Sequence, residues 1–526
     1  MKNRIKIIIL VVVVGIAGLL LSTSCNNDEF LRQEQGSTGF NEPRNTIDLE
    51  LLIEGSYYAM SGAGGFQGVL NTPVWTSTAA SDEGWLPVGT QVAIRDDIRN
   101  WWDRDFSNRD DIQVARLWSA AYGAINNANL LIDFIDPNQD GEVDNQFNDR
   151  NAADWTPRIL GEAYFLRAFN YWLLVKQFGP PPTADPDAPS VLLRSSPPSN
   201  AFDNPSPSPV SEVYDLMVSD LDKAIELLPE EFDNERDPAP YADRALKWAA
   251  HFQAARTHFM LGNWDQAESH ASTVIDAGLY ELQDDVLDAW NNNEYAQQAP
   301  EVIWQYVTYN NNQQRWKPPV IHRFFGYTDP NGNPDRYNNN QQLSLATWLV
   351  DELGWDDPDV AALDNRHNIL YVRHDGDDPR ETLDEVDELR VWPNKWYRAE
   401  FTGWGTASLA SLPLMRLPEM YLTRALIRLE NGDAQGAADD LNQVKERAWA
   451  GDPANFTPVS ASEITEDMIH LERLIEFAFE GDRIWYLQAL EQDIPPGDRI
   501  GEGPFPFGEV YFPIPLTEAD VNPNVD

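Results

Sequence analysis

Hydrophobic side chains recur every three or four positions over long stretches of the chain, which is the spacing of one face of an α-helix. Residues 161–178 are apolar almost all round, as is typical of a buried helix, and a Gly-Pro-Pro-Pro run at 179–182 ends the pattern. Residues 114–135 carry a clear stripe made by Leu117, Ala121, Ala124, Ala128 and Leu131. Further helices are predicted near residues 49–60, 209–228 and 464–490.

Two segments have the pattern of a tetratricopeptide-like helical hairpin, with small residues where paired helices approach and a glycine at the turn. In residues 245–278 the pattern is made by Ala255, Phe259, Gly262, Trp264, Ala267 and Ala271. A degenerate second copy in residues 414–445 has Leu422, Ala425, Leu429, Gly432, Ala437 and Leu441. Because the spacing is irregular, a plain repeat array is excluded. The sequence predicts a mainly α fold, a tetratricopeptide-like scaffold with long, irregular insertions.

The largest predicted insertion covers residues 283–410, which are rich in Asn, Gln, Asp, Trp and Tyr and have few helical runs. Residues 61–112 have a similar loop-like mixture. Long loops on a rigid scaffold commonly carry binding groups. We therefore divide the chain into a signal peptide (1–24), an N-terminal region with the first hairpin (25–282), an irregular ligand-binding insertion (283–410) and a C-terminal region with closing helices (411–526).

The N-terminus has the pattern of an export signal. Lys2, Arg4 and Lys6 precede an apolar run over residues 7–21, which is shorter than the roughly 20 residues that span a bilayer. The only cysteine, Cys25, follows after Ser22, Thr23 and Ser24. This resembles a bacterial lipoprotein signal, in which the cysteine is lipidated, although Ser22 stands where a large aliphatic residue is usual. An uncleaved anchor and an ordinary secretory signal are the alternatives.

Charge and cysteine content exclude several classes of protein. The 526 residues include 85 Asp+Glu and 38 Lys+Arg, for a net charge of −47, so nucleic acid is not an expected partner. A hydrophobic content of 42% is too high for a mainly disordered chain. One cysteine cannot form an intrachain disulfide or a Cys-rich zinc site, so stability must come from a packed core.

Six stretches, in their order along the chain, resemble the SusD/RagB family of outer-membrane nutrient-binding lipoproteins. They are residues 118–131 (WSAAYGAINNANLL), 161–179 (GEAYFLRAFNYWLLVKQFG), 213–229 (VYDLMVSDLDKAIELLP), 413–425 (PLMRLPEMYLTRA), 471–483 (LERLIEFAFEGDR) and 513–515 (PIP). The resemblance covers essentially all of residues 25–526. The chain departs from the family after Asn522, where the usual Gln-Asn-Pro-Gly-Tyr-like ending is missing.

This resemblance implies a binding protein rather than an enzyme. Family members cover a TonB-dependent, SusC-like outer-membrane transporter, capture oligosaccharides or in some members peptides, and deliver them to the pore. The implied partners are that transporter, an oligosaccharide and the outer membrane, reached through a lipid on Cys25. The protein would face the cell exterior, since Asp28 and Glu29 resemble the surface-export signal of Bacteroidetes lipoproteins. A RagB-like protein that binds peptides or glycopeptides is the alternative, and a helical glycan-degrading enzyme is less favoured.

Sugar binding needs aromatic faces for the C–H side of a pyranose and planar polar groups for its hydroxyls. Two regions of the sequence have this mixture, and family members place ligand contacts in loops from the same two broad regions. The candidate ligand contacts are Trp75, Trp85 and Trp101, next to Trp102, in the first region and Arg315, Trp316, Tyr327 and Tyr337 in the second. The alternative for each tryptophan is a packing role. The net charge favours a neutral or cationic ligand over a polyanion.

Residues 136–144 resemble the first nine positions of an EF-hand or dockerin calcium loop. Oxygen ligands stand at Asp136, Asn138, Asp140, Glu142 and Asp144, with a glycine at the sixth position. Position 12 is Phe147 instead of an acidic residue. No cofactor is required by the predicted function, so a structural calcium ion is the one candidate. A solvated acidic turn is the alternative.

No catalytic constellation is indicated. Glu472, Arg473, Glu476, Glu480 and Arg483 lie at helical spacing, where two carboxylates could serve as glycosidase residues. Ion pairs that lock this helix to its neighbours are the preferred interpretation. The sequence has no H-E-x-x-H, G-x-S-x-G, G-x-G-x-x-G or Walker A motif.

Overall fold

The computed structural model describes much of the chain, with gaps in the predicted loop regions. The described residues are 43–60, 69–86, 96–149, 151–199, 203–232, 244–284, 286, 289, 299–306, 343–374, 390–393, 395 and 412–525. They are mostly helical, which confirms the predicted fold class.

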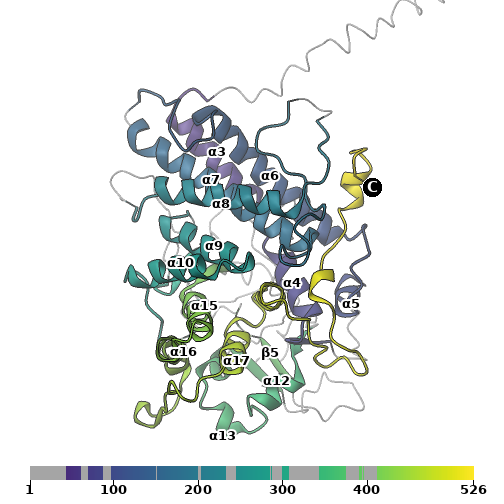
Figure 1. The fold of residues 1–526 in the computed structure, drawn as a ribbon, viewed down its shortest axis with the longest axis vertical. Helices are drawn as coiled ribbons and strands as arrows, with labels where there is room; N and C mark the ends of the chain where they lie inside the picture. Colours follow the sequence, from purple (N-terminus) through teal and green to yellow (C-terminus); the bar gives the residue numbers. More distant parts are fainter. Residues whose placement is uncertain are drawn as a thin grey trace, which may run out of the picture.

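The N-terminal half is built around one long buried helix, α7 (Ala152–Phe178). It packs against α6 (Ile112–Ile135), α8 (Val210–Leu227) and α3 (Thr46–Ala59), as Figure 1 shows. Almost every side chain of α7 from Ile159 onward is buried, as the all-round apolar pattern predicted. The helix stops at Gly179, where proline follows and the backbone becomes extended.

Both predicted hairpins are present. The first is α9 (Lys247–Met260) with α10 (Trp264–Asp276), and the second is α15 (Leu417–Glu430) with α16 (Ala434–Ala448). Gly262 and Gly432 make the two turns with φ of 72° and 84°, a left-handed conformation that glycine adopts without strain. Helix α10 packs on α15, so the hairpins stack on one another below the α7 layer (Figure 1).

The single helix predicted over residues 464–490 is wrong. The structure has two helices, α17 (Glu466–Phe477) and α18 (Arg483–Ala489). The chain between them leaves helical geometry at Ala478 (ψ 135°) and turns through positive φ at Phe479 (65°) and Gly481 (82°). The turn is dictated by tertiary contacts, because an added side chain at Gly481 would lie 3.0 Å from the Cα of Val74.

Three two-stranded antiparallel ladders lie in or at the edges of the predicted loop regions. They pair β1 (Gly84–Trp85) with β3 (Ser344–Leu345), β2 (Val302–Tyr306) with β6 (Leu412–Arg416), and β4 (Tyr371–His374) with β5 (Arg390–Pro393). The β2–β6 ladder joins strands more than one hundred residues apart in sequence. It therefore brings the two ends of the insertion together.

The loop regions contain more helix than the sequence predicted. In residues 61–112 the structure has α4 (Asn71–Ala80) and α5 (Asp96–Trp102), and the insertion has α12 (Thr347–Glu352), α13 (Pro358–Ala361) and α14 (Asn365–Leu370). These helices are short, and the apolar stripe of each is too brief for the helix to be identified from its hydrophobic periodicity.

The C-terminal segment returns across the N-terminal helices (Figure 1). It contains the 3-10 turn η4 (Phe507–Glu509) and the short helix α19 (Leu516–Ala519), and an earlier turn, η3 (Pro453–Asn455), follows α16. The amide of Phe512 donates to the carbonyl of Gln177 at 2.7 Å, and Trp118 Nε1 donates to Glu518 at 3.3 Å. One contiguous hydrophobic core runs through these layers. Among the described helices, none has the length and apolar character needed to cross a membrane.

Candidate ligand-binding site

The β1–β3 ladder connects the two sequence regions predicted to hold ligand. Gly84 pairs with Leu345, and Trp85 pairs with Ser344. Strand β1 leads directly toward the segment 87–95, and β3 follows directly on the segment 307–342, both outside the described residues. Because the strands are antiparallel, the end of β1 and the start of β3 lie beside each other. The described flanks of the two regions therefore meet at one place.

Trp85 is the one residue of the predicted ligand set that the structure describes with part of its side chain accessible. It is half-buried at the end of β1. Trp75 in α4 and Trp101 in α5 have no exposed surface at all. A ligand cannot stack on a wholly buried ring, so Trp75 and Trp101 are packing residues here and we withdraw them as ligand contacts.

Arg315, Trp316, Tyr327 and Tyr337 lie outside the described residues, and their role stays a prediction. The same is true of lipidation at Cys25.

Hydrogen bonds and an ion pair connect the β1–β3 ladder and its flanking residues to parts of the chain that are distant in sequence. The amide of Ala346 donates to the carbonyl of Glu83 at 2.9 Å, and Trp348 Nε1 donates to the carbonyl of Asp82 at 2.7 Å. Arg483, which opens α18, donates to both carboxylate oxygens of Asp82 at 2.8 Å each. Such two-point ionic hydrogen bonds fix direction as well as distance. The position of β1 is thus set by the C-terminal scaffold.

Two arginines cap the C-terminal end of α4, next to the ladder. Arg499 donates to the carbonyls of Ser81 and Trp102 at 2.9 and 2.7 Å and also to Ala79, while Arg104 donates to Ala80 at 3.0 Å. The guanidinium of Arg499 lies 4.0 Å from the ring centroid of half-buried Trp102. Burial, followed by repulsion from Arg104, lowers the pKa of Arg499 to about 9. Cations at a helix C-terminus satisfy carbonyls that lack an intrahelical partner.

Glu83 lies directly before β1 and is wholly buried. Burial raises the pKa of its carboxyl to about 8. The neighbouring charge of Asp82 adds to that shift, and the amide of Phe479, which donates to Glu83 at 3.4 Å, opposes it. Glu83 is therefore mainly protonated at pH 7. The acid next to the ladder is therefore neutral, whereas Asp82 before it is ion-paired with Arg483.

The predicted calcium loop is a self-contained turn. Gly141 has the positive φ expected at its position (93°). However, the buried carboxylate of Asp136 already accepts from Tyr164 Oη at 2.6 Å and from the amide of Gly141 at 2.7 Å. Asn138 donates its side-chain amide to Asp144 at 2.7 Å, and Asp140 accepts from the amide of Glu142 at 3.0 Å. These groups close the loop upon itself and do not converge on a common point.

Within the described ranges, no three His, Cys, Asp or Glu side chains gather in a way that could hold a metal ion. The predicted calcium site at residues 136–144 is thus not supported by the geometry, and we derive no role for calcium.

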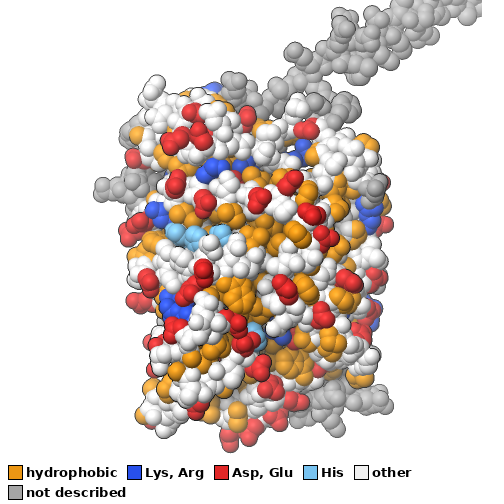
Figure 2. All heavy atoms as spheres, in the orientation of Figure 1, with side chains coloured by type: hydrophobic (Ala, Val, Ile, Leu, Met, Phe, Trp, Pro, Cys, Tyr) orange, Lys and Arg blue, Asp and Glu red, His pale blue; other side chains and the backbone are white. Residues whose placement is uncertain are grey.

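A histidine patch on the face shown in Figure 2 is made by His251, His258 and His270 between α9 and α10. Burial, and then the other two histidines, lower the pKa of His270 to about 4.

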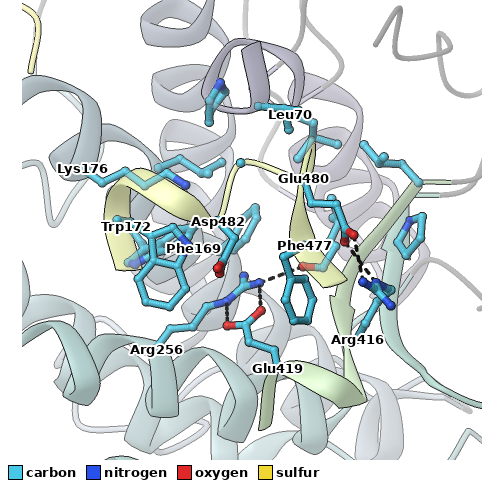
Figure 3. A pocket seen from close by; sticks show the side chains of 18 residues that line it. Leu70, Phe169, Trp172, Lys176, Arg256, Arg416, Glu419, Phe477, Glu480 and Asp482 are labelled. Carbon is cyan, nitrogen blue, oxygen red and sulfur yellow. Dashed lines mark hydrogen bonds and ion pairs between the residues drawn. The ribbon is translucent and has the colours of Figure 1, made fainter. Parts of the chain in front are cut away.

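The carboxylates of α17 and of the link to α18 form ion pairs with neighbouring elements, the interpretation preferred from the sequence. Glu476 accepts from Arg416 at 2.8 Å, Arg447 at 2.5 Å and Arg366 at 3.2 Å. Glu480 accepts from Arg416 and Lys395, both at 2.8 Å, and Arg473 donates to both oxygens of Asp482 at 2.8 Å. We call this group, with Glu301 and Glu472, the arginine seam; part of it is drawn in Figure 3.

The partners of these carboxylates are not predictable from the local sequence. Arg366 and Arg416 stand more than fifty residues from Glu476, and no local pattern links them. A signal did exist at Arg416, because it is the one charged residue of an otherwise apolar strand and is buried at its end. A charged residue at a core position generally needs a buried partner.

Comparison with known proteins agrees with this fold. Residues 46–259 match a family model described as "Starch-binding associating with outer membrane", and residues 385–488 match the "SusD family" model. The two matches together span more than half of the chain.

The SusD-like protein P2 of Formosa agariphila is 26% identical over 461 residues, which are 84% of this chain and 83% of the relative. A SusD superfamily protein from Bacteroides thetaiotaomicron has a TM-score of 0.69 at 21% identity, with 92% of this chain and 99% of that chain covered. A structure described as a putative sugar binding protein from Bacteroides vulgatus has a TM-score of 0.69 at 20% identity, covering 92% and 98%. From its sequence motifs, its family matches and its fold, the chain belongs to the SusD/RagB family.

Proposed function

We propose that this protein is a cell-surface lipoprotein that binds an oligo- or polysaccharide and delivers it to a TonB-dependent transporter in the outer membrane. Membership of the SusD/RagB family supports binding of a glycan. The observation that carries the proposal within this chain is the β1–β3 ladder. It joins the flanks of both aromatic-rich regions and leaves Trp85 partly accessible at their meeting point.

Trp85 is the proposed stacking residue of the described part. An indole face packs against the C–H face of a sugar ring, and its position is fixed by the pairing of β1 with β3. The ion pair of Arg483 with Asp82 holds the backbone two residues before β1. Binding would therefore require little ordering of the Trp85 backbone, which favours affinity.

Surface charge bears on the class of glycan. Acidic side chains are spread over the face shown in Figure 2, in keeping with the net charge of −47. A polyanionic glycan would meet repulsion that depends on ionic strength. We therefore propose a neutral glycan as the ligand.

A panel of oligosaccharides, measured by calorimetry on the purified protein, tests this function. For a glycan that binds, Trp85→Ala should weaken affinity by roughly tenfold, which is the loss of one aromatic contact. Trp449→Ala is the matched control, since Trp449 is a half-buried tryptophan at the end of α16. Equal affinities for the three proteins would remove Trp85 from the site. Trp316→Ala, assayed beside them, tests the second predicted region.

The same measurements separate the alternatives. Binding to peptides but to no glycan in the panel would favour a RagB-like peptide-binding protein. Release of shorter products during long incubation would favour an enzyme, and we expect intact glycan to be recovered.

Anchoring and delivery need a separate test in cells. We expect Cys25→Ser to abolish acylation, seen by mass spectrometry of the mature N-terminus, and to release the protein from the membrane fraction. Affinity purification of the lipidated protein from outer membranes should recover a TonB-dependent transporter. Recovery of none, from membranes that contain it, would contradict the delivery role.

A further inference from the structure

A cavity of about 70 Å³ lies where the N-terminal helices meet the arginine seam. Its walls come from α7, the first turn of α4, α9, β6 and the link between α17 and α18 (Figure 3). Phe169, Trp172, Phe477 and Trp485 supply aromatic walls. A second cavity of about 20 Å³ shares Pro73, Lys176, Gly481 and Trp485 with the first. The larger space could hold about two water-sized groups and is too small for a sugar ring.

Each carboxylate on the wall of the larger cavity already has a cation bound to it. Glu419 accepts from Arg256 at 2.7 and 2.6 Å, as Figure 3 shows. Asp482 is held by Arg473, and Glu480 by Arg416 and Lys395. These Arg forks use both oxygens of Glu419 and of Asp482. The carboxylates are thereby satisfied without any other donor.

Lys176 differs from the other charged groups of the wall. Its Nζ lies 3.8 Å from the ring centroid of Trp172, and it makes no hydrogen bond or ion pair within the described part of the chain. The side chain is half-buried on α7 and lines both cavities. Burial, followed by repulsion from Arg256, lowers the pKa of Lys176 to about 7, while Asp482 and Glu419 oppose that shift. The charged residues that line the larger cavity are three cations and three carboxylates: Lys176, Arg256, Arg416, Glu419, Glu480 and Asp482. Of these six, Lys176 alone has no hydrogen-bonded or ion-paired partner within the described part of the chain.

We propose that this cavity binds one small monovalent anion, chloride or a small carboxylate such as formate, next to the ammonium of Lys176. The anion would provide the acceptor that Lys176 lacks. Its size fits the cavity. Burial strengthens the attraction relative to water. The site is separate from Trp85, so its failure would leave the proposed glycan binding untouched.

Thermal unfolding of the full chain at constant ionic strength provides the first test. Chloride or formate replaces gluconate, an anion too large for the cavity, from 0 to about 100 mM. We expect the Tm of the wild type to rise by a few degrees with the anion that binds, and the Tm of Lys176→Met to stay unchanged. Methionine keeps an unbranched stem over Trp172 without the charge.

Lys223→Met is the matched control for this series. Lys223 also lies over an aromatic ring, with Nζ 5.0 Å from the centroid of Tyr164, but it donates to Ser219 at 2.9 Å and lines neither cavity. This variant should keep the anion response of the wild type. General salt effects act on all three proteins alike and cancel in the comparison. Equal responses of wild type and Lys176→Met would overturn the proposal.

A second measurement does not depend on a variant that folds. Reductive methylation with ¹³C-formaldehyde labels lysines while keeping their charge, and the resonance of each dimethyl-lysine reports its pKa. In gluconate the Lys176 pKa should lie well below that of the exposed lysines, and chloride or formate should raise it. The same pKa in all three salts would overturn the proposal, whereas a rise with one salt alone identifies the anion.

Discussion

Glu476 in the arginine seam and Glu83 beneath the β1–β3 ladder are the same residue type, almost equally buried, in opposite charge states. The exposed fraction is 2% for Glu476 and 0% for Glu83. Burial alone would raise the pKa of Glu476, but Arg447, Arg416, Arg366 and Lys395 together hold it well below its usual range. Burial raises the pKa of Glu83 to about 8, and Arg483 close by is bound to Asp82 instead.

At Glu476 the surrounding cations outweigh the effect of burial on the pKa, whereas at Glu83 burial dominates. In the scaffold, several arginines from separate elements meet one acid, which ties β6, α14, α16 and α17 together. Beside the ladder the acid is neutral, and the carbonyl of Glu83 contributes instead by accepting from Ala346. The two regions should therefore respond differently to charge removal and to pH.

The largest expected effect follows from removing the charge of Glu476. Glu476→Gln leaves Arg366, Arg416 and Arg447 with fewer counter-charges in a buried setting, which we expect to lower the free energy of unfolding by about 3–5 kcal/mol. Urea unfolding followed by tryptophan fluorescence measures this.

The control is Glu466→Gln, which removes a carboxylate from the same helix at an exposed position. Its effect should stay within about 0.5 kcal/mol. If the two variants unfolded at the same urea concentration, the seam would not be a stabilising network.

The second prediction concerns Glu83 and pH. Its pKa is about 8 in the folded protein against 4.5 as the ordinary value. Between these two pH values the folded state binds a proton that the unfolded state has released, so stability from this group is full below about pH 4.5 and is lost as pH rises to about 8. The slope is on the order of 1 kcal/mol per pH unit.

Glu83→Gln replaces the neutral acid with a neutral amide of the same shape and should remove this slope. Its oxygen can still accept from the amide of Phe479, as Glu83 does at 3.4 Å. We expect the variant to equal or fall slightly below the wild type at pH 5 and to exceed it at pH 8. Other groups titrate in both proteins, so the difference between their unfolding free energies is the quantity to follow. A difference independent of pH would contradict the assignment.

The local sequence pattern was enough to predict the two helical hairpins, because the residues that determine each hairpin lie within one short stretch of the chain. Gly262 and Gly432 stand at turns that need positive φ, and small residues flank them on both helices. The break between α17 and α18 was not predictable in this way. Its conformation depends on the close approach of Gly481 to Val74 and on the hydrogen bond that Arg416 donates to Glu480. Val74 and Arg416 are both far from this break in the sequence.

The candidate site was predictable only in outline. Trp75, Trp85 and Trp101 all stand in glycine- and polar-rich sequence, yet only Trp85 is partly exposed, because α4 and α5 bury the other two. The turn at Gly141 was predicted correctly from its own residues. The calcium site stays a prediction, and no local spacing reveals that Tyr164 on α7 donates to Asp136.

The smallest predicted effect tests whether the arginine seam sets the position of the β1–β3 ladder through Gly481, which lies between Glu480 and Asp482. Gly481→Ala and Gly432→Ala both place alanine at positive φ, 82° and 84°, which costs about 1 kcal/mol. A side chain at Gly432 meets nothing within 4 Å, whereas one at Gly481 lies 3.0 Å from the Cα of Val74 in α4.

We therefore expect Gly481→Ala to lower the unfolding free energy by about 1–2 kcal/mol more than Gly432→Ala does, because α4 must shift to admit the methyl group. Since α4 leads directly into β1, the same shift should weaken glycan binding in Gly481→Ala and leave it unchanged in Gly432→Ala. Unfolding midpoints and calorimetric affinities of the two variants provide the comparison. Equal stabilities would mean that α4 yields freely at this contact, so that the seam does not set the position of the ladder through Gly481.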